Sequence, residues 1–156
     1  MTDRSAVAPE VVIIGRVLVD FYPETDGPLS EARLYRSAIG GSPANVAIAA
    51  ARLGLATEFI GCVGDDPLGR FVRAEFARTN VGQNGLRSLP GVLTPVAVCE
   101  IDPPDRFPLA FYRPAPAADL QIERTDVDSA LVDRARLVWA SLSGMSGEPA
   151  RDAVLH

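Results

Sequence analysis

Two uninterrupted apolar runs, each followed by a helical pattern, constrain the fold of this chain more than any other feature. The first run is VVIIGRVLVD (Val11–Asp20) and the second is ATEFIGCVG (Ala56–Gly64). Both are rich in β-branched residues and lack regular polar alternation, which is typical of strands buried on both faces of a parallel sheet. The order strand, helix, strand, helix predicts an α/β fold in which helices flank a parallel sheet.

Capping and breaking residues mark the two expected helices. Ser42 suits the N-cap of the first helix, Pro43 its first turn and Gly54 its C-terminal stop. Either of two aspartates is expected to cap the second helix, whose apolar face repeats at i, i+3, i+4 and i+8. These residues are Asp65 or Asp66 for the cap, and Leu68, Phe71, Val72 and Phe76 for the face.

The segment after the second helix does not continue the alternation of strands and helices. Pro95–Ile101 and Pro108–Arg113 are strand-like runs on either side of the turn DPPDRF. They predict a hairpin outside the main sheet, because prolines suit edge strands. A short strand-like piece, Arg33–Ile39, precedes the first helix. Ala135–Ser143 is expected to be another buried strand, and a last helix is expected to open at Glu148.

Composition excludes several classes of protein. The chain has 156 residues, 47% of them hydrophobic, which is enough for the core of one globular domain. Its formal net charge of −5 argues against nucleic acids and anionic membranes as partners. Its first apolar run, Val11–Ile14, is too short for a membrane span or a signal peptide, so a cytoplasmic protein is expected.

The histidine and cysteine content limits the kinds of catalytic and metal sites that this chain can contain. The single histidine, His156, excludes Ser–His–Asp catalysis, Cys–His catalysis and histidine-based metal sites from this chain. Cys62 and Cys99 lie far apart in apolar, strand-like contexts. They are therefore expected to be buried free thiols, and no metal site is predicted.

The stretch SAIGGSPANVAIAAARLGL (Ser37–Leu55) carries the strongest functional signal. It is neither a G-x-G-x-x-G fingerprint nor a Walker loop. Gly40 and Gly41 nevertheless allow another molecule to approach the backbone, and the first N–H groups of the helix are free to donate. Asn45 adds an amide, and Asp20 is expected at the carboxyl end of the first strand, where α/β sheets bind ligands. A hydroxylated ligand would suit these groups. The alternative is a turn capped by Asp20, a tight glycine bend and a solvent-facing Asn45.

The spacing of these residues resembles the N-terminal signature of the ribokinase-like (PfkB) carbohydrate kinases. The matching positions are Gly40, Gly41, Pro43, Asn45, Ala47, Gly54 and Gly64, followed by GDDPLG. The resemblance implies a ribokinase-like, Rossmann-type sheet with a small β-lid that closes over a sugar, and it implies ATP and Mg²⁺ as cofactors. The lid is expected to include segments 21–40 and 95–113.

Within the family, four stretches most resemble kinases of 5-dehydro-2-deoxygluconate, a sugar acid of inositol catabolism. They are IGRVLVDFYP, GGSPANVA, FIGCVGDDPLGRFVR and FPLAFYRPAPAADL. Kinases of 2-keto-3-deoxygluconate or fructose remain alternatives. Ser42 stands where ribokinase has a lysine after its glycine pair, which argues against ribose.

The resemblance also implies roles for individual residues. Asp20 corresponds to the aspartate that holds sugar hydroxyls, and Gly40, Gly41 and Asn45 correspond to groups lining the same pocket. Tyr112 and Arg113 occupy a lid position where kinases of acid sugars carry aromatic and basic groups. Arg16 is a second candidate for pairing with a substrate carboxylate. For both arginines the alternative is an ordinary surface cation. Tyr22 and Phe111 are expected to pack within the lid.

The catalytic part of the family signature is not found in this sequence. Family members take their base and anion hole from a Gly-Ala-Gly-Asp stretch in the C-terminal half, where ATP and Mg²⁺ also bind. No such stretch occurs here. Residues 1–156 are therefore expected to form the N-terminal, sugar-binding part of one kinase domain, without a catalytic residue. Either the remainder completes the enzyme, or the chain is a sugar-binding module. Self-association or poor stability is expected, because a truncated parallel sheet exposes an edge.

Overall fold

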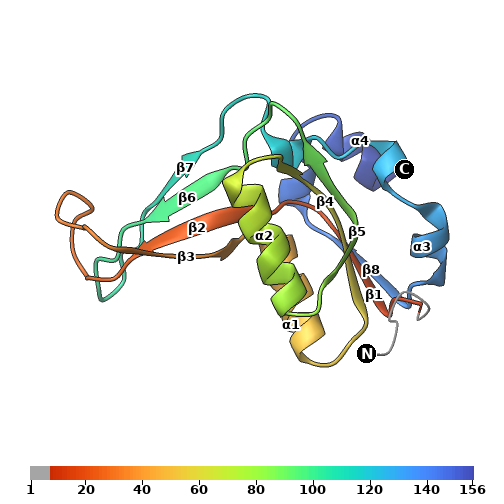
Figure 1. The fold of residues 1–156 in the computed structure, drawn as a ribbon, viewed down its shortest axis with the longest axis horizontal. Helices are drawn as coiled ribbons and strands as arrows, with labels where there is room; N and C mark the ends of the chain where they lie inside the picture. Colours follow the sequence, from red (N-terminus) through yellow and green to blue (C-terminus); the bar gives the residue numbers. More distant parts are fainter. Residues whose placement is uncertain (1–7) are drawn as a thin grey trace.

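The computed structural model describes residues 8–156 and contains two four-stranded sheets (Figure 1). The main sheet has the order β5-β4-β1-β8 and all its strands are parallel. Its strands are β1 (Val11–Ile14), β4 (Thr57–Gly64), β5 (Gly82–Leu89) and β8 (Leu137–Ala140). The predicted α/β fold with a parallel sheet is confirmed.

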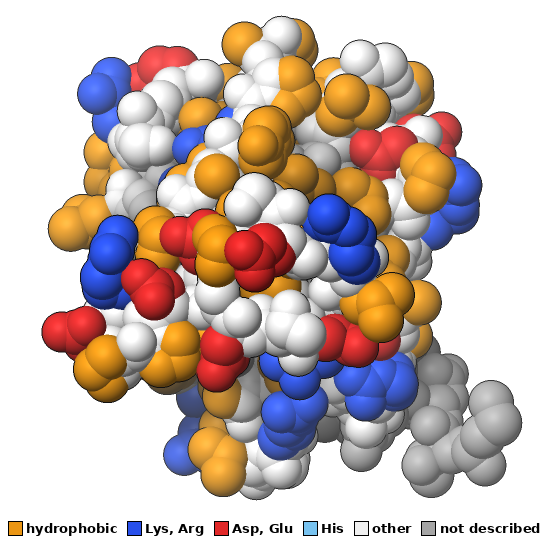
Figure 2. Space-filling model, turned by 90° about the vertical axis from the view of Figure 1, so that its left-hand side faces the viewer, with side chains coloured by type: hydrophobic (Ala, Val, Ile, Leu, Met, Phe, Trp, Pro, Cys, Tyr) orange, Lys and Arg blue, Asp and Glu red, His pale blue; other side chains and the backbone are white. Residues whose placement is uncertain are grey.

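The second sheet projects from one side of the molecule, and we call it the lid (Figure 1). Its order is β3-β2-β6-β7, with antiparallel outer pairs and a parallel central pair. Its strands are β2 (Leu18–Pro23), β3 (Tyr35–Gly40), β6 (Val96–Cys99) and β7 (Leu109–Tyr112). The hairpin expected outside the main sheet is β6–β7. Figure 2 looks onto the lid end and shows hydrophobic side chains interspersed with acidic and basic ones.

The prediction of one continuous strand over Val11–Asp20 is wrong. Strand β1 ends at Ile14, the chain turns through residues 15–17, and β2 continues in the lid. The turn lies close against the first helix, because a Cβ added to Gly15 would come within 2.6 Å of Pro43 Cγ. As a result, Asp20 lies inside a lid strand and does not end a strand of the main sheet.

Helices α1 (Ser42–Arg52) and α2 (Pro67–Arg78) cover one face of the main sheet (Figure 1). Asp66 caps α2 as one of the two expected aspartates, but the cap residue of α1 is Gly41, so the prediction of Ser42 as the cap is wrong. The core on this face includes buried residues of β1, β4, α1 and α2, among them Ile13, Ala47, Phe59, Val72 and Phe76.

The opposite face is covered by shorter elements. They are α3 (Ser129–Arg134), α4 (Ala150–Leu155) and the 3₁₀ turns η2 (Ala118–Leu120), η3 (Arg124–Asp126) and η4 (Leu142–Met145). Their core includes Cys62, Ile122 and Ala153. Cys62 and Cys99 are buried free thiols, as predicted, and burial raises the pKa of Cys62 to about 11.

Strand β8 differs from its prediction as a buried strand. It pairs with β1 alone, and the side chain exposures of Leu137 and Val138 are 55% and 42%. Leu142, just beyond the strand, is 83% exposed. Trp139 packs against the core and is only partly buried. Among the described residues, no helix is long and apolar enough to cross a membrane.

Candidate functional site

The Asp20 carboxylate lies directly against the backbone of Gly40. Asp20 pairs with Ala38 across β2 and β3, and Gly40 is its diagonal neighbour on the same face of the lid. A Cβ added to Gly40 would lie 2.1 Å from Asp20 Oδ1. A side chain at position 40 would therefore displace the carboxylate, which explains why the sequence has a glycine there.

Gly41 joins this strand to helix α1 in a conformation that favours glycine. Its φ is +94°, and an added Cβ would lie 2.8 Å from the carbonyl oxygen of Arg16. The amide of Asn45 lies one turn into the helix and is exposed, while its backbone N–H donates to Gly41 O at 3.0 Å. Helix α1 thus begins two residues after Gly40, the glycine that contacts the Asp20 carboxylate, and its first turn carries backbone donors and the exposed Asn45 amide.

Tyr22 forms a hydrogen bond with Asp20 and affects the pKa of its carboxyl group. Its hydroxyl donates a hydrogen bond to Asp20 Oδ2 at 3.1 Å. Burial raises the pKa of Asp20 from its ordinary value, and the bond from Tyr22 opposes that rise. Burial and the neighbouring Asp20 charge also raise the pKa of Tyr22, which stays a hydroxyl donor at neutral pH. Asp20 is therefore a half-buried acceptor that a ligand hydroxyl would satisfy.

The register of the lid determines which side chains share a face with Asp20. Asp20 pairs with Ala97, and Ala97 pairs with Phe111 on β7, so these three residues point to the same side. Tyr112 pairs with Val96 and belongs to the opposite face. Phe111, expected only to pack, is therefore better placed beside Asp20 than the candidate Tyr112. The same face carries an open hollow of about 410 Å³ lined by Tyr22, Cys99, Ile101, Phe107 and Leu109.

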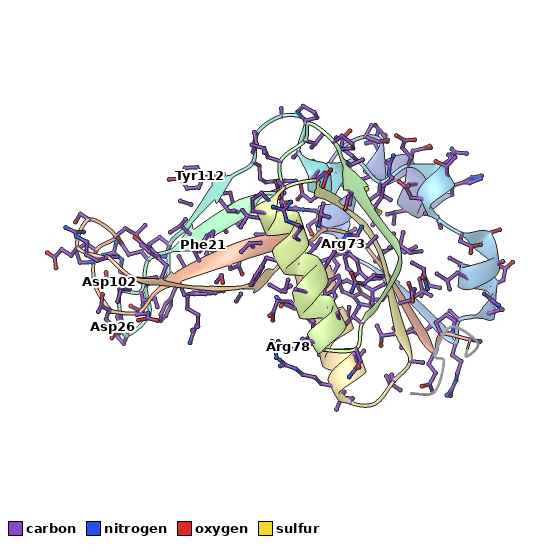
Figure 3. The ribbon with its side chains drawn as sticks, viewed as in Figure 1. Phe21, Asp26, Arg73, Arg78, Asp102 and Tyr112 are labelled. Atoms are coloured by element: carbon purple, nitrogen blue, oxygen red, sulfur yellow. The ribbon has the colours of Figure 1, made fainter. Side chains whose placement is uncertain are left out.

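Figure 3 labels residues at different positions along the lid. Asp26 and Asp102 lie at the far tip, whereas Phe21 lies on β2, between that tip and the main sheet. Asp20 directly precedes Phe21 on β2, so the candidate site lies nearer to the main sheet than the tip of the lid does.

The two candidate arginines converge on one buried residue. Arg16 Nε donates to Asp119 Oδ2 at 2.7 Å, and Arg113 Nη2 donates to the same oxygen at 2.9 Å. Arg16 also donates through Nη1 to the carbonyl oxygen of Ser143 at 3.2 Å. The arginine side chains are 13% and 24% exposed, and Asp119 is 0% exposed. Neither arginine is an ordinary surface cation.

Sequence reasoning missed Asp119, and no local signal would have found it. The contact between Arg16 and Asp119 spans 103 positions, and APAADL contains no motif that marks a buried carboxylate. Of the seven predicted residues, Asp20 and Gly40 are in direct contact, and Gly41 lies against the carbonyl of Arg16. Asn45 is one turn further into helix α1, and its backbone N–H donates to Gly41 O. Arg113 connects to this group through Asp119, and Tyr112 lies on the other face of the lid.

A larger cavity, of about 1000 Å³, lies at the opposite end of the main sheet. Its lining includes Glu10, Thr57 and Glu58, which are at the amino ends of β1 and β4. Ligands of open parallel sheets bind at the carboxyl ends of the strands. The candidate site is therefore placed at the carboxyl end of β1, where the lid joins.

ATP and Mg²⁺ would require donors for the phosphates and side-chain ligands for the metal. The described residues contain no group of three or more histidine, cysteine, aspartate or glutamate side chains placed to hold a metal ion. The full sequence has no Gly-Lys-Ser/Thr phosphate loop.

Comparison with known proteins identifies the family. The sequence profile of the pfkB family carbohydrate kinases matches residues 8–154. The chain belongs to this family. The resemblance inferred from the glycine and asparagine spacing is therefore confirmed at the level of the family.

Two curated pfkB-type relatives are 35% identical to this chain over 147 residues. One is 5-dehydro-2-deoxygluconokinase 1 of Bacillus cereus, and the alignment covers 93% of this chain and 44% of the relative. The other is the probable chloroplastic fructokinase-6 of Arabidopsis thaliana, with 94% and 38% covered. The chain thus spans less than half the length of these relatives.

A solved structure shows the same fold. A sugar kinase of Pyrococcus horikoshii, crystallised in complex with ATP, superposes with a TM-score of 0.83 at 26% sequence identity. The match covers 93% of this chain and 47% of that kinase. The ribokinase-like fold is therefore confirmed for the part of the kinase that this chain represents.

Proposed function

We propose that this chain binds the sugar substrate of an ATP-dependent carbohydrate kinase. The observation that carries the proposal is the Asp20 carboxylate, held against Gly40 beside the free N–H groups of helix α1. A carboxylate, backbone donors and the Asn45 amide together match a ligand with several hydroxyl groups. Asp20 would accept hydrogen bonds from the sugar, and Asn45 would both donate and accept.

The substrate proposed is 5-dehydro-2-deoxygluconate, as in inositol catabolism. Support comes from the Bacillus cereus relative and from Arg16 and Arg113, whose guanidinium groups suit a substrate carboxylate. The equally identical Arabidopsis relative supports fructose as the alternative. 2-Keto-3-deoxygluconate is a second acid alternative.

Phosphoryl transfer requires a base at the accepting hydroxyl, backbone donors for the developing charge, and ATP with Mg²⁺. ATP with its metal would supply the phosphoryl group. We propose that these parts belong to protein outside residues 1–156, and that this chain orients the acceptor sugar while the lid limits access of water. The non-enzymatic alternative is a sugar-binding half-domain. The reduced, buried state of Cys62 and Cys99 suits a cytoplasmic location.

Calorimetric titration with a panel of sugars tests the proposal. The panel is 5-dehydro-2-deoxygluconate, 2-keto-3-deoxygluconate, fructose and ribose, titrated into the wild-type chain and the Asp20→Asn variant. We expect one acid to bind best and Asp20→Asn to weaken it at least about tenfold, because hydrogen bonds to a charged group are lost. Asp26→Asn is the matched control, since Asp26 is an exposed lid carboxylate at the far tip (Figure 3).

A coupled ADP-release assay with ATP, Mg²⁺ and the same panel distinguishes a chain that phosphorylates the sugar by itself from one that only binds it. Turnover by the chain alone would contradict the placement of the base and nucleotide site elsewhere. Binding without turnover supports that placement. The absence of binding by every member of the panel would contradict the proposed function.

A further inference from the structure

The Arg16–Asp119–Arg113 cluster joins three separate parts of the fold. Arg16 lies in the turn between β1 and β2, Arg113 directly follows lid strand β7, and Asp119 lies in the 3₁₀ turn η2. A single carboxylate oxygen, Asp119 Oδ2, accepts from both guanidinium groups. Asp119 therefore fixes the position of a residue of the main sheet's carboxyl edge relative to a residue of the lid.

The cluster has a surplus of positive charge and of donors. Two guanidinium groups and one carboxylate give these three residues a formal charge of +1. Asp119 Oδ1 and Arg113 Nε are buried and have no hydrogen-bond partner among the described residues. Arg16 uses Nε and Nη1, and Arg113 uses Nη2, so each guanidinium retains N–H groups for a further acceptor.

A charged group that is buried this completely requires partners, because an isolated carboxylate would be strongly destabilising. The two arginines meet that requirement at Asp119 Oδ2, while Oδ1 has no hydrogen-bond partner among the described residues. In return, Asp119 restricts two long side chains that would otherwise sample many rotamers, and ordering them in advance lowers the entropic cost of binding an anion. A surface ion pair would not have this effect, since solvent would screen it.

We propose that Asp119 is a positioning residue that orients Arg16 and Arg113 to select sugar acids over neutral sugars. This inference rests on the proposed function and deepens it by assigning the preference for an acid to one buried residue. The ligand class is a monocarboxylic sugar acid, whose carboxylate balances the positive charge of the cluster. Asp119 itself does not contact the ligand carboxylate.

The test is titration of wild-type and Asp119→Asn chains with 5-dehydro-2-deoxygluconate and with fructose. Asparagine keeps the size of the side chain but removes the charge that holds the guanidinium groups. We expect the acid to bind Asp119→Asn about 10- to 100-fold more weakly, the range seen when partners that orient metal-binding side chains are removed. Fructose binding is expected to change by less than about twofold.

Asp126→Asn is the matched control, because Asp126 Oδ1 contacts Arg87 Nε at 2.9 Å and its side chain is 10% exposed. This variant also removes a carboxylate charge from a partly buried aspartate–arginine contact, but away from the candidate site, so its ratio of acid to fructose affinity should equal that of the wild type. A ligand-independent readout is the Arg16 Nε–H resonance in a ¹⁵N NMR spectrum. It should shift and exchange faster with water in Asp119→Asn only.

Each result supports or overturns the inference. Tighter acid binding by Asp119→Asn would overturn it, because net charge rather than orientation would then govern affinity. Equal weakening of acid and fructose would show a structural role alone. If wild-type chain binds the acid and Asp119→Asn binds it equally well, the inference fails while the proposed function stands. If wild-type chain binds neither ligand, both fail.

Discussion

At the scale of single residues, the contact between Gly40 and the Asp20 carboxylate predicts that a substitution at position 40 weakens sugar binding but hardly changes the stability of the fold. Gly40→Ala would place a methyl group where Asp20 Oδ1 now lies, and the carboxylate would rotate away. We expect sugar affinity to fall roughly tenfold or more, since charged hydrogen bonds are worth about 1.5–3 kcal/mol. Calorimetry would measure the affinity, and thermal unfolding should change little.

Gly147→Ala is the control for this substitution, because the nearest atom to its added Cβ is Leu120 Cδ1 at an ordinary 3.7 Å. Equal sugar affinity in Gly40→Ala and wild type would contradict the assigned contact.

Site residues that lie close together in the sequence could be predicted from it, whereas site residues that only the fold brings together could not. The spacing from Gly40 to Asn45 is local, so the sequence alone pointed to it. Asp119 became visible only through its arginine partners. The sequence also could not tell which of Phe111 and Tyr112 shares a face with Asp20. Neighbours on a strand face opposite sides, and the side that each one faces follows only from the register with β6.

At the scale of elements, helix α2 depends on its N-cap. Asp66 accepts from Gly69 N at 2.7 Å, Thr94 N at 2.7 Å and Thr94 Oγ1 at 2.9 Å. Asp66→Ala should lower the free energy of unfolding by about 1–3 kcal/mol, measured by urea denaturation at pH 7. Asp65→Ala, at an exposed neighbour, should change it by less than about 0.5 kcal/mol. Equal effects of the two substitutions would contradict the cap.

The same cap predicts a pH dependence with a defined sign. Burial alone would raise the pKa of Asp66, but hydrogen bonds from Thr94, Gly69 and Leu68 outweigh it and lower the pKa below its ordinary value near 4. The stabilisation is therefore complete above about pH 5 and is lost as pH falls through the lowered pKa. The difference in stability between wild type and Asp66→Ala should shrink over that acidic range.

The element order followed from local periodicity, but some boundaries did not. The break at residues 15–17 lies inside an apolar run and is set by packing of the turn on Pro43. Strand β5, with sequence GQNGLRSL, was not predicted because its glycines and polar residues do not resemble a buried strand. It is held by parallel pairing with β4, a contact between distant segments.

At the scale of the whole molecule, the β8 edge of the main sheet predicts self-association. Leu137 and Val138 are exposed on a strand with one neighbour, and such edges pair with other chains. We propose a homo-oligomer formed through this edge. Light scattering should give a mass that rises with concentration for wild type and stays near one chain for Val138→Lys, because lysine on an edge opposes pairing.

Leu53→Lys is the control, since Leu53 is an isolated exposed leucine at the end of α1. A wild-type chain that stays monomeric at every concentration, or a Val138→Lys variant that associates as wild type does, would contradict the proposal. The resemblance to longer kinases predicted an exposed edge, but periodicity did not show that β8 forms it, because an apolar strand has the same pattern at an edge and in the middle of a sheet.

The most direct test of the account is the titration of wild type and Asp20→Asn with 5-dehydro-2-deoxygluconate. We expect saturable binding to the wild-type chain and at least about tenfold weaker binding to Asp20→Asn, with Asp26→Asn unchanged. Equal affinity in wild type and Asp20→Asn would contradict the placement of the sugar beside Asp20 and Gly40.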